Sequence, residues 1–469
     1  MKNSETADGS AGGLSAAEAA EFGAADADEI AGIEADLAEL RERGIVGIPE
    51  ERTEIKRHGL IKSMCLNVCH DCNLRCAYCF ASHGDYGDKS DDKLDVKGVG
   101  KNADNGGGYG RKSDDKRREN DCGYGGKSDK YMSLDAAKAA VDFLIRMSGG
   151  RRNLEIDFFG GEPLMNLGVV KETVKYAEER CAKYGKNINF TMTTNGLLLP
   201  AAVDFLNEKM ENVVISIDGR PSVHDRLRKT AGGAGSFGAV IKNAKEFRAA
   251  RGDKKYYIRG TYTRENLDFG EDILFLNDCG FDQISVEPVV LPQDDPLSLS
   301  EADADKIAAE YERFASEYLD RRRTDKWFNF FHFMIDLEKS PCAYKRLNGC
   351  GAGDEYVAVT PSGEIFPCHQ FVGKPEFSLG SVFGGELNSD IREKFQKSNV
   401  YTKENCGRCF AKYFCGGGCA ANSVACENDI NKVNGLYCRI VRKRAELSLA
   451  VLAEERKEKL KTVAGNAGA

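Results

Sequence analysis

Apolar and polar residues alternate in six short segments that recur through the first two thirds of the chain. These segments are residues 61–69, 154–159, 188–193, 213–217, 256–263 and 283–287. Apolar residues at helical spacing lie between or after them, in the stretches 134–147, 165–184, 200–210, 237–251 and 266–278, with Ser133 as a candidate N-cap. Strands that alternate with helices over short links form parallel sheets. The pattern therefore predicts an α/β fold of six β/α units, arranged as a barrel or partial barrel over residues 59–290.

The segments on either side of this alternation have different compositions. Residues 1–58 predict a tail and one amphipathic helix, which is either docked on the main body or the remnant of a peptide-binding module; its apolar positions are Ile30, Ile33, Leu37 and Leu40. Residues 291–341 form a bridging region with a charged helix from Glu301 to Arg322 and an aromatic run at 327–333, which we expect to pack between domains. Residues 342–445 are rich in cysteine, and residues 446–469 predict a C-terminal helix and tail.

Residues 84–130 interrupt the alternation with a Gly, Asp, Lys and Ser stretch that contains an internal repeat. The pattern Tyr-Gly-x-Lys-Ser-Asp begins at Tyr86, Tyr109 and Tyr124. Such a polar composition buries too little apolar surface to offset the entropy of ordering, so the stretch predicts a mobile surface loop. Cys122 lies inside it and is interpreted as a bystander.

The net charge, the apolar content and the number of cysteines indicate which classes of protein the chain can belong to. The chain has 469 residues, 41% of them apolar, and a net charge of -8, which argues against a general binder of nucleic acid or of membrane surfaces. The polar N-terminus lacks the apolar core of a signal peptide, and no later apolar run reaches spanning length. We therefore expect a cytoplasmic protein. In a reducing compartment its 17 cysteines are expected to be metal ligands and buried free thiols instead of disulfides.

Three of these cysteines follow the first predicted strand in one tight loop, Cys72-x3-Cys76-x2-Cys79. Three thiolates can hold three irons of a cubane cluster and leave the fourth iron open for chemistry. A zinc knuckle or scattered core thiols are the alternatives. Cys69 competes as a ligand because it lies two residues before Cys72, although a strand residue ahead of the loop is more often a core thiol.

Polar residues recur at the ends of the following strands. The second strand ends in Gly160-Gly161-Glu162, the third in Thr194-Asn195-Gly196 and the fourth in Ser216-Ile217-Asp218, with Arg228 beyond. In a parallel barrel these ends meet on the face where the working residues lie. Taken singly, each is also compatible with ordinary turn chemistry and surface charge.

Nine of the 17 cysteines lie between residues 342 and 438. The regular part of the set reads Cys350-x12-Gly363-x4-Cys368, then Cys406-x2-Cys409-x5-Cys415-x3-Cys419, and finally Cys438. Without further information this spacing predicts one or two tetrahedral zinc sites. The glycines 416–418 allow the chain to wrap closely around a cluster. Cys426 falls outside the pattern and is interpreted as a free thiol.

The N-terminal loop resembles the signature of the radical S-adenosylmethionine (SAM) enzymes, and the seven C-terminal cysteines resemble the SPASM extension of those that act on peptides and proteins. The first resemblance implies a 4Fe-4S cluster on Cys72, Cys76 and Cys79, with SAM on the open iron. It also implies SAM contacts from Tyr78, Gly160, Gly161, Glu162, Asn195, Ser216, Asp218 and Arg228. The second implies two auxiliary 4Fe-4S clusters, one on Cys350, Cys368 and Cys419 with Cys342 as a candidate fourth ligand, and one on Cys406, Cys409, Cys415 and Cys438.

Over residues 60–445 the chain is most similar to the SCIFF-peptide maturases. Segments that carry this resemblance include Cys69 to Cys76, Asp157 to Pro163, Ser216 to Arg226 and Cys342 to Cys350. The resemblance implies that the protein forms thioether cross-links in a Cys-rich precursor peptide, with a flavodoxin or ferredoxin as electron donor. Two departures are the longer insertion at 84–130 and an N-terminus in which only the final helix of the leader-binding module is recognisable. An anaerobic sulfatase-maturating enzyme is the rival from the same class, and a zinc-stabilised binding protein is the rival from another.

Overall fold

The computed structural model describes residues 59–82, 130–335 and 343–466, together with Ala35, Ala38, Glu39 and Glu42, and describes side chains in the last range from 346 to 458. The chain divides into two units, Met1–Lys56 and Arg57–Ala469. In the first unit the four described residues are helical. The predicted apolar positions of that helix, the insertion up to residue 129, Cys122 and Cys342 lie outside the described residues.

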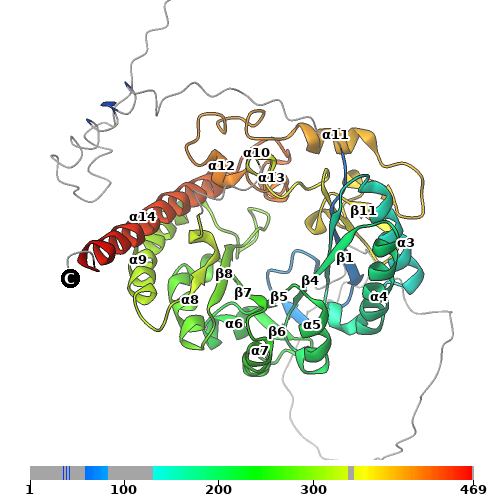
Figure 1. Ribbon diagram of the computed structural model, residues 1–469, viewed down its shortest axis with the longest axis horizontal. Coiled ribbons are helices and arrows are strands. Elements are labelled where there is room, and N and C mark those ends of the chain that lie inside the picture. The colour runs from blue at the N-terminus through cyan, green and yellow to red at the C-terminus, as the bar shows by residue number, and fades with distance from the viewer. Residues whose placement is uncertain are drawn as a thin grey trace, which may run out of the picture. The chain divides into compact units, whose positions relative to one another are not determined.

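Six parallel strands form the centre of the second unit, and they confirm the predicted α/β partial barrel. In sheet order they are β1 (Ser63–Cys69), β3 (Asn153–Gly160), β4 (Asn187–Thr194), β5 (Asn212–Ser216), β7 (Lys255–Tyr262) and β8 (Gln283–Pro288). The helices on the outside of this curved sheet are α3 (Leu134–Met147), α4 (Leu167–Lys183), α5 (Val203–Lys209), α7 (Phe237–Arg251) and α8 (Phe269–Asp278) (Figure 1). The α3 bounds agree with the prediction, and the Ser133 side chain accepts a hydrogen bond from the Ala136 N–H as its N-cap.

Strands β3, β4, β5 and β7 alternate between a buried face and a more accessible face. On β7, Tyr256, Ile258 and Tyr262 are buried, whereas Tyr257 and Arg259 between them are half-buried and exposed. Because successive side chains of a strand point to opposite faces, the apolar core lies between sheet and helices. The lumen of the barrel is left lined by polar residues.

Additional strands extend the sheet at both edges. At one edge β9 (Asn329–Phe330) pairs with β8, and at the other β10 (Tyr356–Val359) pairs in parallel with β1. The antiparallel strands β11 (Glu364–Phe366) and β12 (Gly380–Ser381) follow β10. A separate sheet consists of β2 (Leu74–Cys76) and β6 (Arg228–Thr230). The cysteine-rich region and the barrel therefore share one continuous sheet.

The remaining helices lie within the barrel segment, in the bridging region and in the C-terminal part of the chain. They are α6 (Pro221–Leu227), α9 (Ala304–Arg322), α10 (Ala343–Asn348), α11 (Ser389–Lys397), α12 (Lys412–Cys415), α13 (Ala420–Glu427) and α14 (Gly435–Asn466). Short 3₁₀ turns are η2 (Pro163–Asn166), η3 (Leu199–Ala201), η4 (Arg264–Asn266), η5 (Glu301–Asp303), η6 (Phe331–Phe333), η7 (His369–Phe371) and η8 (Pro375–Phe377). Helix α14 packs along α9 (Figure 1).

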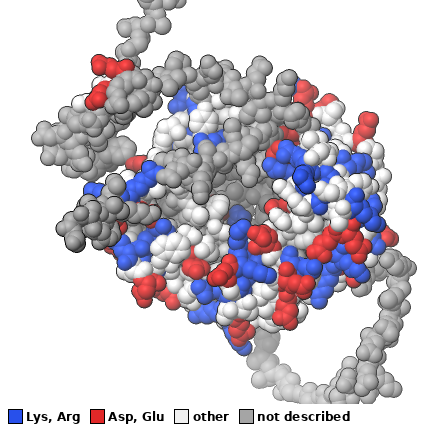
Figure 2. Space-filling model, in the orientation of Figure 1, with Lys and Arg blue, Asp and Glu red and all other residues white. Residues whose placement is uncertain are grey.

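The C-terminal helix begins earlier than predicted, at Gly435, so Cys438 lies on it. The residues of the predicted aromatic run differ in their burial. Phe330 and Phe333 contact the α9 rings of Phe314 and Tyr318, whereas Phe331 is exposed. Basic and acidic side chains are interspersed over the face shown in Figure 2. Within the part of the chain that the structure describes, none of the helices combines the length and apolarity that crossing a membrane requires.

Candidate active site

The loop with Cys72, Cys76 and Cys79 directly follows β1, at the carboxyl end of the barrel strands. Its thiols lie within electrostatic range of one another: the charges of Cys72 and Cys79 raise the pKa of Cys76, and that of Cys79 raises the pKa of Cys72. Burial is the larger cause and raises these pKa values to about 12 for Cys76 and about 11 for Cys72. Thiols can become ligands of a metal cluster, because metal binding displaces their protons. Among the described residues, no three or more His, Cys, Asp or Glu side chains are drawn together as ligands of a single metal ion.

Cys69 differs from these three cysteines in its surroundings. It is the last residue of β1 and is buried, and its sulfur accepts a hydrogen bond from the Asp71 N–H at 3.3 Å. Tyr131 lowers its pKa through a second hydrogen bond, although burial raises that pKa to about 11 overall. These contacts support the interpretation of Cys69 as a core thiol.

A buried polar cluster fixes the cysteine loop to β5 and β6. Cys76 is paired with Arg228 across the β2–β6 sheet, and Arg228 Nε donates to Asp218 Oδ2 at 2.9 Å. Tyr78 Oη donates to the same carboxylate, with distances of 2.8 and 2.7 Å to its two oxygens, and the Arg228 guanidinium lies 5.3 Å from the Tyr78 ring centroid. Thr261 N–H adds a bond to Asp218 Oδ1 at 3.0 Å. The structure thus brings together three predicted SAM contacts, and these contact one another.

The predicted Gly160-Gly161-Glu162 turn packs against the backbone that leads into the cysteine loop. Gly161 N–H donates to Cys69 O at 2.7 Å, and Glu162 N–H donates to Asp71 O at 2.9 Å. A Cβ added at Gly161 would lie 2.1 Å from Asp71 O, so a larger residue would displace this backbone. The close approach that the paired glycines permit is therefore made to the protein's own chain.

Glu162 also joins the ends of β3 and β4. It is fully buried, and its carboxylate accepts hydrogen bonds from Thr194 Oγ1 at 2.8 Å, from Asn195 N–H at 2.8 Å and from Leu164 N–H at 3.1 Å. Burial raises its pKa to about 7, against these hydrogen bonds. Asn195 in turn extends its amide to Cys72 Sγ at 3.6 Å and to Asn73 Oδ1 at 2.7 Å. Ser216, half-buried, is the last residue of β5.

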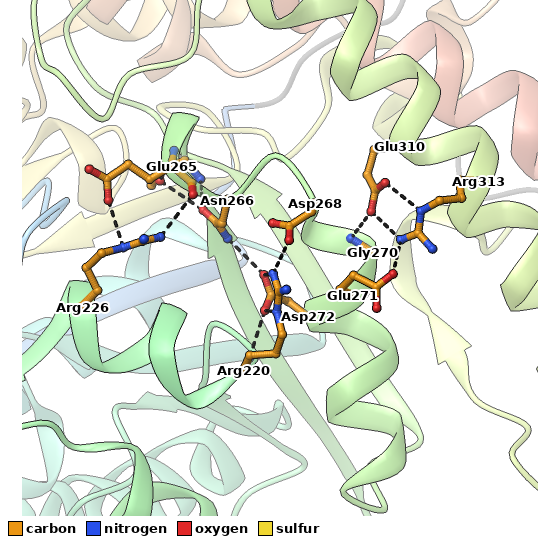
Figure 3. Close-up of polar contacts among 11 residues, drawn as sticks. Arg220, Arg226, Glu265, Asn266, Asp268, Gly270, Glu271, Asp272, Glu310 and Arg313 are labelled. Carbon is orange, nitrogen blue, oxygen red and sulfur yellow. Dashed lines mark hydrogen bonds and ion pairs between the residues drawn. The ribbon is translucent and has the colours of Figure 1, made fainter.

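Beyond Asp218 the chain is held by a charged network that joins α6, η4, α8 and α9 (Figure 3). Arg220 Nε donates to the buried Asp272 at 2.7 Å and Arg220 Nη2 donates to Asp268 at 2.8 Å. Asn266 donates to the same Asp272 carboxylate at 3.3 Å. The network fixes the segment between Asp218 and Arg228 from the outside of the barrel.

The C-terminal cysteines act electrostatically on one another in two sets, here called the first and the second group. In the first group, the charges of Cys419 and Cys350 raise the pKa of Cys368, and that of Cys419 raises the pKa of Cys350; burial is the larger cause for both thiols. In the second group, the charges of Cys438 and Cys406 raise the pKa of Cys415. The charge of Cys409 raises the pKa values of Cys406 and Cys438. Cys426 bonds to Asn422 Oδ1 through its sulfur at 3.4 Å.

A cavity of about 340 Å³ lies against the second group and is lined by all four of its cysteines and by Cys419 of the first group. Gly417 and Gly418 line it, and together with Gly416 they form three consecutive glycines with φ angles of 68, 89 and 76° for Gly416, Gly417 and Gly418. Such angles are accessible to glycine at little cost. Burial raises the pKa of Cys415. The N–H groups of Gly417 and Gly418 donate hydrogen bonds to its sulfur and oppose this effect, so that the pKa is about 11. Cysteine thiols around a cavity, with backbone N–H donors to one sulfur, are the ligand type that a 4Fe-4S cluster takes.

Aromatic rings join the first C-terminal group to the cysteine loop. Phe80 follows Cys79, and its ring centroid lies 5.5 Å from that of His369, which follows Cys368. Phe159, at the end of β3, lies 4.8 Å from His369 and 6.5 Å from Phe80. The first C-terminal group and the N-terminal loop are therefore neighbours, which the sequence spacing alone does not indicate.

Sequence reasoning missed charged residues in the barrel lumen. Asp157 on β3 accepts a hydrogen bond from Thr191 Oγ1 at 2.8 Å, and burial raises its pKa to about 6. Glu287 on β8 is half-buried, and although desolvation raises its pKa, the neighbouring charges of His332, Arg444 and Arg259 lower it to about 2. Arg259 on β7 has a half-exposed side chain and lowers the pKa of both carboxyl groups. A charged residue at alternating positions of a strand is the signal that could have revealed them.

Comparison with known proteins agrees with this geometry. The profile of the Radical SAM superfamily matches residues 66–276. The chain is 24% identical over 287 residues to a cysteine-type anaerobic sulfatase-maturating enzyme of Clostridium novyi, an alignment that covers 58% of this chain and 74% of that protein.

Two solved structures share the fold. One is native anSMEcpe with bound AdoMet, with a TM-score of 0.63 and 19% identity, covering 84% of this chain and 99% of that one. The other is Streptococcus suis SuiB bound to its precursor peptide SuiA, with a TM-score of 0.52 and 15% identity, covering 87% and 88%. The radical SAM partial barrel with a cysteine-rich C-terminal region is thus the fold of this protein.

Proposed function

We propose that this chain is a radical SAM enzyme of the SPASM peptide-maturase group and that it installs thioether cross-links in a Cys-rich ribosomal precursor peptide. The observation that carries the proposal is the adjacency of the first C-terminal cysteine group to the radical SAM loop through Phe80, Phe159 and His369. A peptide thiol held near that group would lie close to the site where hydrogen is abstracted. A thiol sulfur and a carbon radical that lie this close can form the carbon–sulfur bond of a thioether.

Cys72, Cys76 and Cys79 would hold the 4Fe-4S cluster that binds SAM. When bound, this pair supplies a 5'-deoxyadenosyl radical by reductive cleavage of SAM, with an electron from a flavodoxin or ferredoxin. The chain's own residues hold the cysteine loop in place, through Arg228 and Asp218 on one side and Asn195 on the other. The contacts of Tyr78, Asp218 and Arg228 with one another favour a role in positioning this loop in addition to the proposed SAM contacts. Gly160, Gly161, Glu162 and Ser216 remain proposed SAM contacts as well.

The C-terminal groups would hold two auxiliary 4Fe-4S clusters. Cys406, Cys409, Cys415 and Cys438 supply four thiolates around the described cavity, as a closed cluster requires. Cys350, Cys368 and Cys419 supply three, and Cys342 is the proposed fourth ligand. A first auxiliary cluster without Cys342 would keep an iron open for a substrate thiolate. In the proposed division of the chain, residues 59–290 are the catalytic core, 342–445 the cluster-binding domain, and 1–58 a remnant of a leader-binding module.

The experiment is an anaerobic incubation of the reconstituted protein with SAM, a reductant and a candidate Cys-rich peptide. Each cross-link removes one hydrogen atom from carbon and one proton and one electron from a thiol, so the peptide mass should fall by two hydrogens with one thiol consumed. Tandem mass spectrometry locates the linked residues. Intact thiols together with an unchanged mass, under conditions in which SAM is cleaved, would contradict the proposal.

A second candidate is formylglycine formation, as in the sulfatase-maturating relatives, which the sequence and fold similarity favours. The same incubation separates the two functions, because formylglycine carries an aldehyde that hydrazine reagents label. A non-catalytic zinc-stabilised protein is the third possibility. Metal analysis of anaerobically purified protein should give about twelve irons for three 4Fe-4S cubanes; zinc in their place would rule out both radical functions.

A further inference from the structure

Lys403 lies between the two C-terminal cysteine groups, and its side chain is almost fully buried, with 6% of the residue exposed. Its Nζ donates to the Gly417 carbonyl at 2.8 Å. Gly417 is the middle residue of the glycine turn that joins Cys415 of the second group to Cys419 of the first. The ammonium group therefore sits at the junction of the two groups.

The first group reaches the same turn from another segment. Gly349 precedes Cys350, and a Cβ added at Gly349 would lie 3.4 Å from the Gly416 carbonyl oxygen, so the two backbones are in contact range. The charge of Lys403 lowers the pKa of Cys350, and it also lowers those of Cys406 and Cys438, although burial raises all three. One cation thus acts on thiols of both groups.

We propose that Lys403 is a positioning residue that holds a single positive charge between the two auxiliary clusters and raises the reduction potentials of both. The proposal rests on the assignment of these cysteines as cluster ligands under the proposed function. Reduction adds negative charge to a cluster, so a nearby cation favours the reduced state. The effect is strong at this position because a buried charge is poorly screened by solvent.

Lys403→Met and Lys403→Gln remove the charge, and the Gln amide can still reach toward Gly417. Lys403→Arg keeps the charge. The measurement is a redox titration of the full-length reconstituted protein followed by electron paramagnetic resonance, in which the signal that changes on SAM addition identifies the SAM-binding cluster. Both remaining midpoint potentials should move to more negative values in the Met and Gln variants and stay near wild type in the Arg variant.

Arg442 provides a matched control. It lines the cavity of the second group and lowers the pKa of Cys438, but its side chain is exposed. Because solvent screens an exposed charge, Arg442→Met should move the second potential less than Lys403→Met does and leave the first unchanged.

Unchanged potentials in Lys403→Met, or a shift of only one cluster, would overturn the proposal while leaving the cluster assignment intact. Loss of auxiliary iron in the Met and Gln variants with full loading in the Arg variant would overturn it as well, since the charge would then be needed to hold the clusters instead of setting their potentials. Loss of auxiliary iron in all three variants would overturn it, because cluster binding would then depend on the shape of the lysine side chain and not on its charge. A wild-type protein with fewer than three clusters would instead contradict the proposed function.

Discussion

At the scale of single residues, the proposed radical chemistry depends on three thiols that no other group in the loop can replace. Changing Cys72, Cys76 and Cys79 together to Ala should abolish SAM cleavage and lower the iron content by about four per chain, the content of one cubane. The auxiliary cysteines lie on other segments, so their iron should remain. Iron analysis and chromatographic detection of 5'-deoxyadenosine test this expectation.

A matched variant distinguishes ligands from core thiols. Cys69→Ala changes a neighbouring thiol whose sulfur bonds to Asp71 instead. This variant should retain the full iron content and measurable SAM cleavage. SAM cleavage that survives in the triple variant, or loss of the same iron in Cys69→Ala, would require a different ligand set.

The surroundings of His224 predict how the free energy of unfolding changes as the pH falls. It is fully buried; its Nδ1 accepts from Asp218 N–H at 3.4 Å, and its Nε2 lies 3.0 Å from Ser236 Oγ, which donates onward to Arg228 O at 2.6 Å. These contacts require the neutral ring with its proton on Nε2, and burial lowers its pKa to about 4. The stability that neutral His224 contributes is therefore present above the unfolded-state pKa near 6.5 and is lost as the pH falls through about 4.

Thermal unfolding of the cluster-free protein between pH 7.5 and 4 measures this effect. His224→Asn should be less stable than wild type at pH 7.5, and its further loss on acidification should be smaller by up to about 3 kcal/mol. Ser222→Ala, an exposed change on the same helix, should keep the wild-type slope. Equal acid sensitivity in all three proteins would show that His224 is not held neutral.

At the scale of elements, the short β2–β6 sheet is the support of the cysteine loop. Arg228→Met leaves the fully buried Asp218 carboxylate without its cation, a change that costs about 3–5 kcal/mol when a buried pair is broken. We expect faster amide hydrogen exchange over residues 72–79, about four fewer irons and little SAM cleavage, with auxiliary iron retained. Lys229→Met, exposed on the same strand, should behave as wild type. Normal iron and exchange in Arg228→Met would exclude this support role.

Elements with many periodic residues could be predicted from the sequence, and short ones could not. The six barrel strands and α3 carry enough alternating or helically spaced residues to identify them, whereas β2 and β6 have three residues each and no usable period. Asn195 and Asp218 could be identified because they follow barrel strands directly and parallel strands gather their carboxyl ends, whereas Arg228 lies beyond the next helix, at the start of β6. Lys403 was missed because a lysine in Thr402-Lys403-Glu404 has no pattern that distinguishes it from a surface residue.

At the scale of the whole molecule, the cysteine-rich region extends the sheet of the barrel and is not a separately folded domain joined only by a linker. Strand β1 pairs with β3 on one side and with β10 on the other, from Ser63 opposite Tyr356 to Leu66 opposite Val359. Strand β1 is almost entirely buried in this position. Removal of the C-terminal region would therefore expose an apolar edge strand with unpaired backbone groups, which is a site for aggregation.

This arrangement predicts that the two regions cannot be separated at the boundary suggested by their sequence patterns. A fragment of residues 57–335 should be recovered largely as aggregate, because β1 loses its partner. A fragment of residues 57–382 retains β10, β11 and β12 and should yield more monomer, although both fragments lack the second cysteine group and α14. Sedimentation velocity and thermal unfolding compare them. A monomeric 57–335 fragment that unfolds cooperatively would mean that the barrel is stable without β10, and that the shared sheet serves to bring the first cysteine group to the radical SAM loop and not to hold the barrel together.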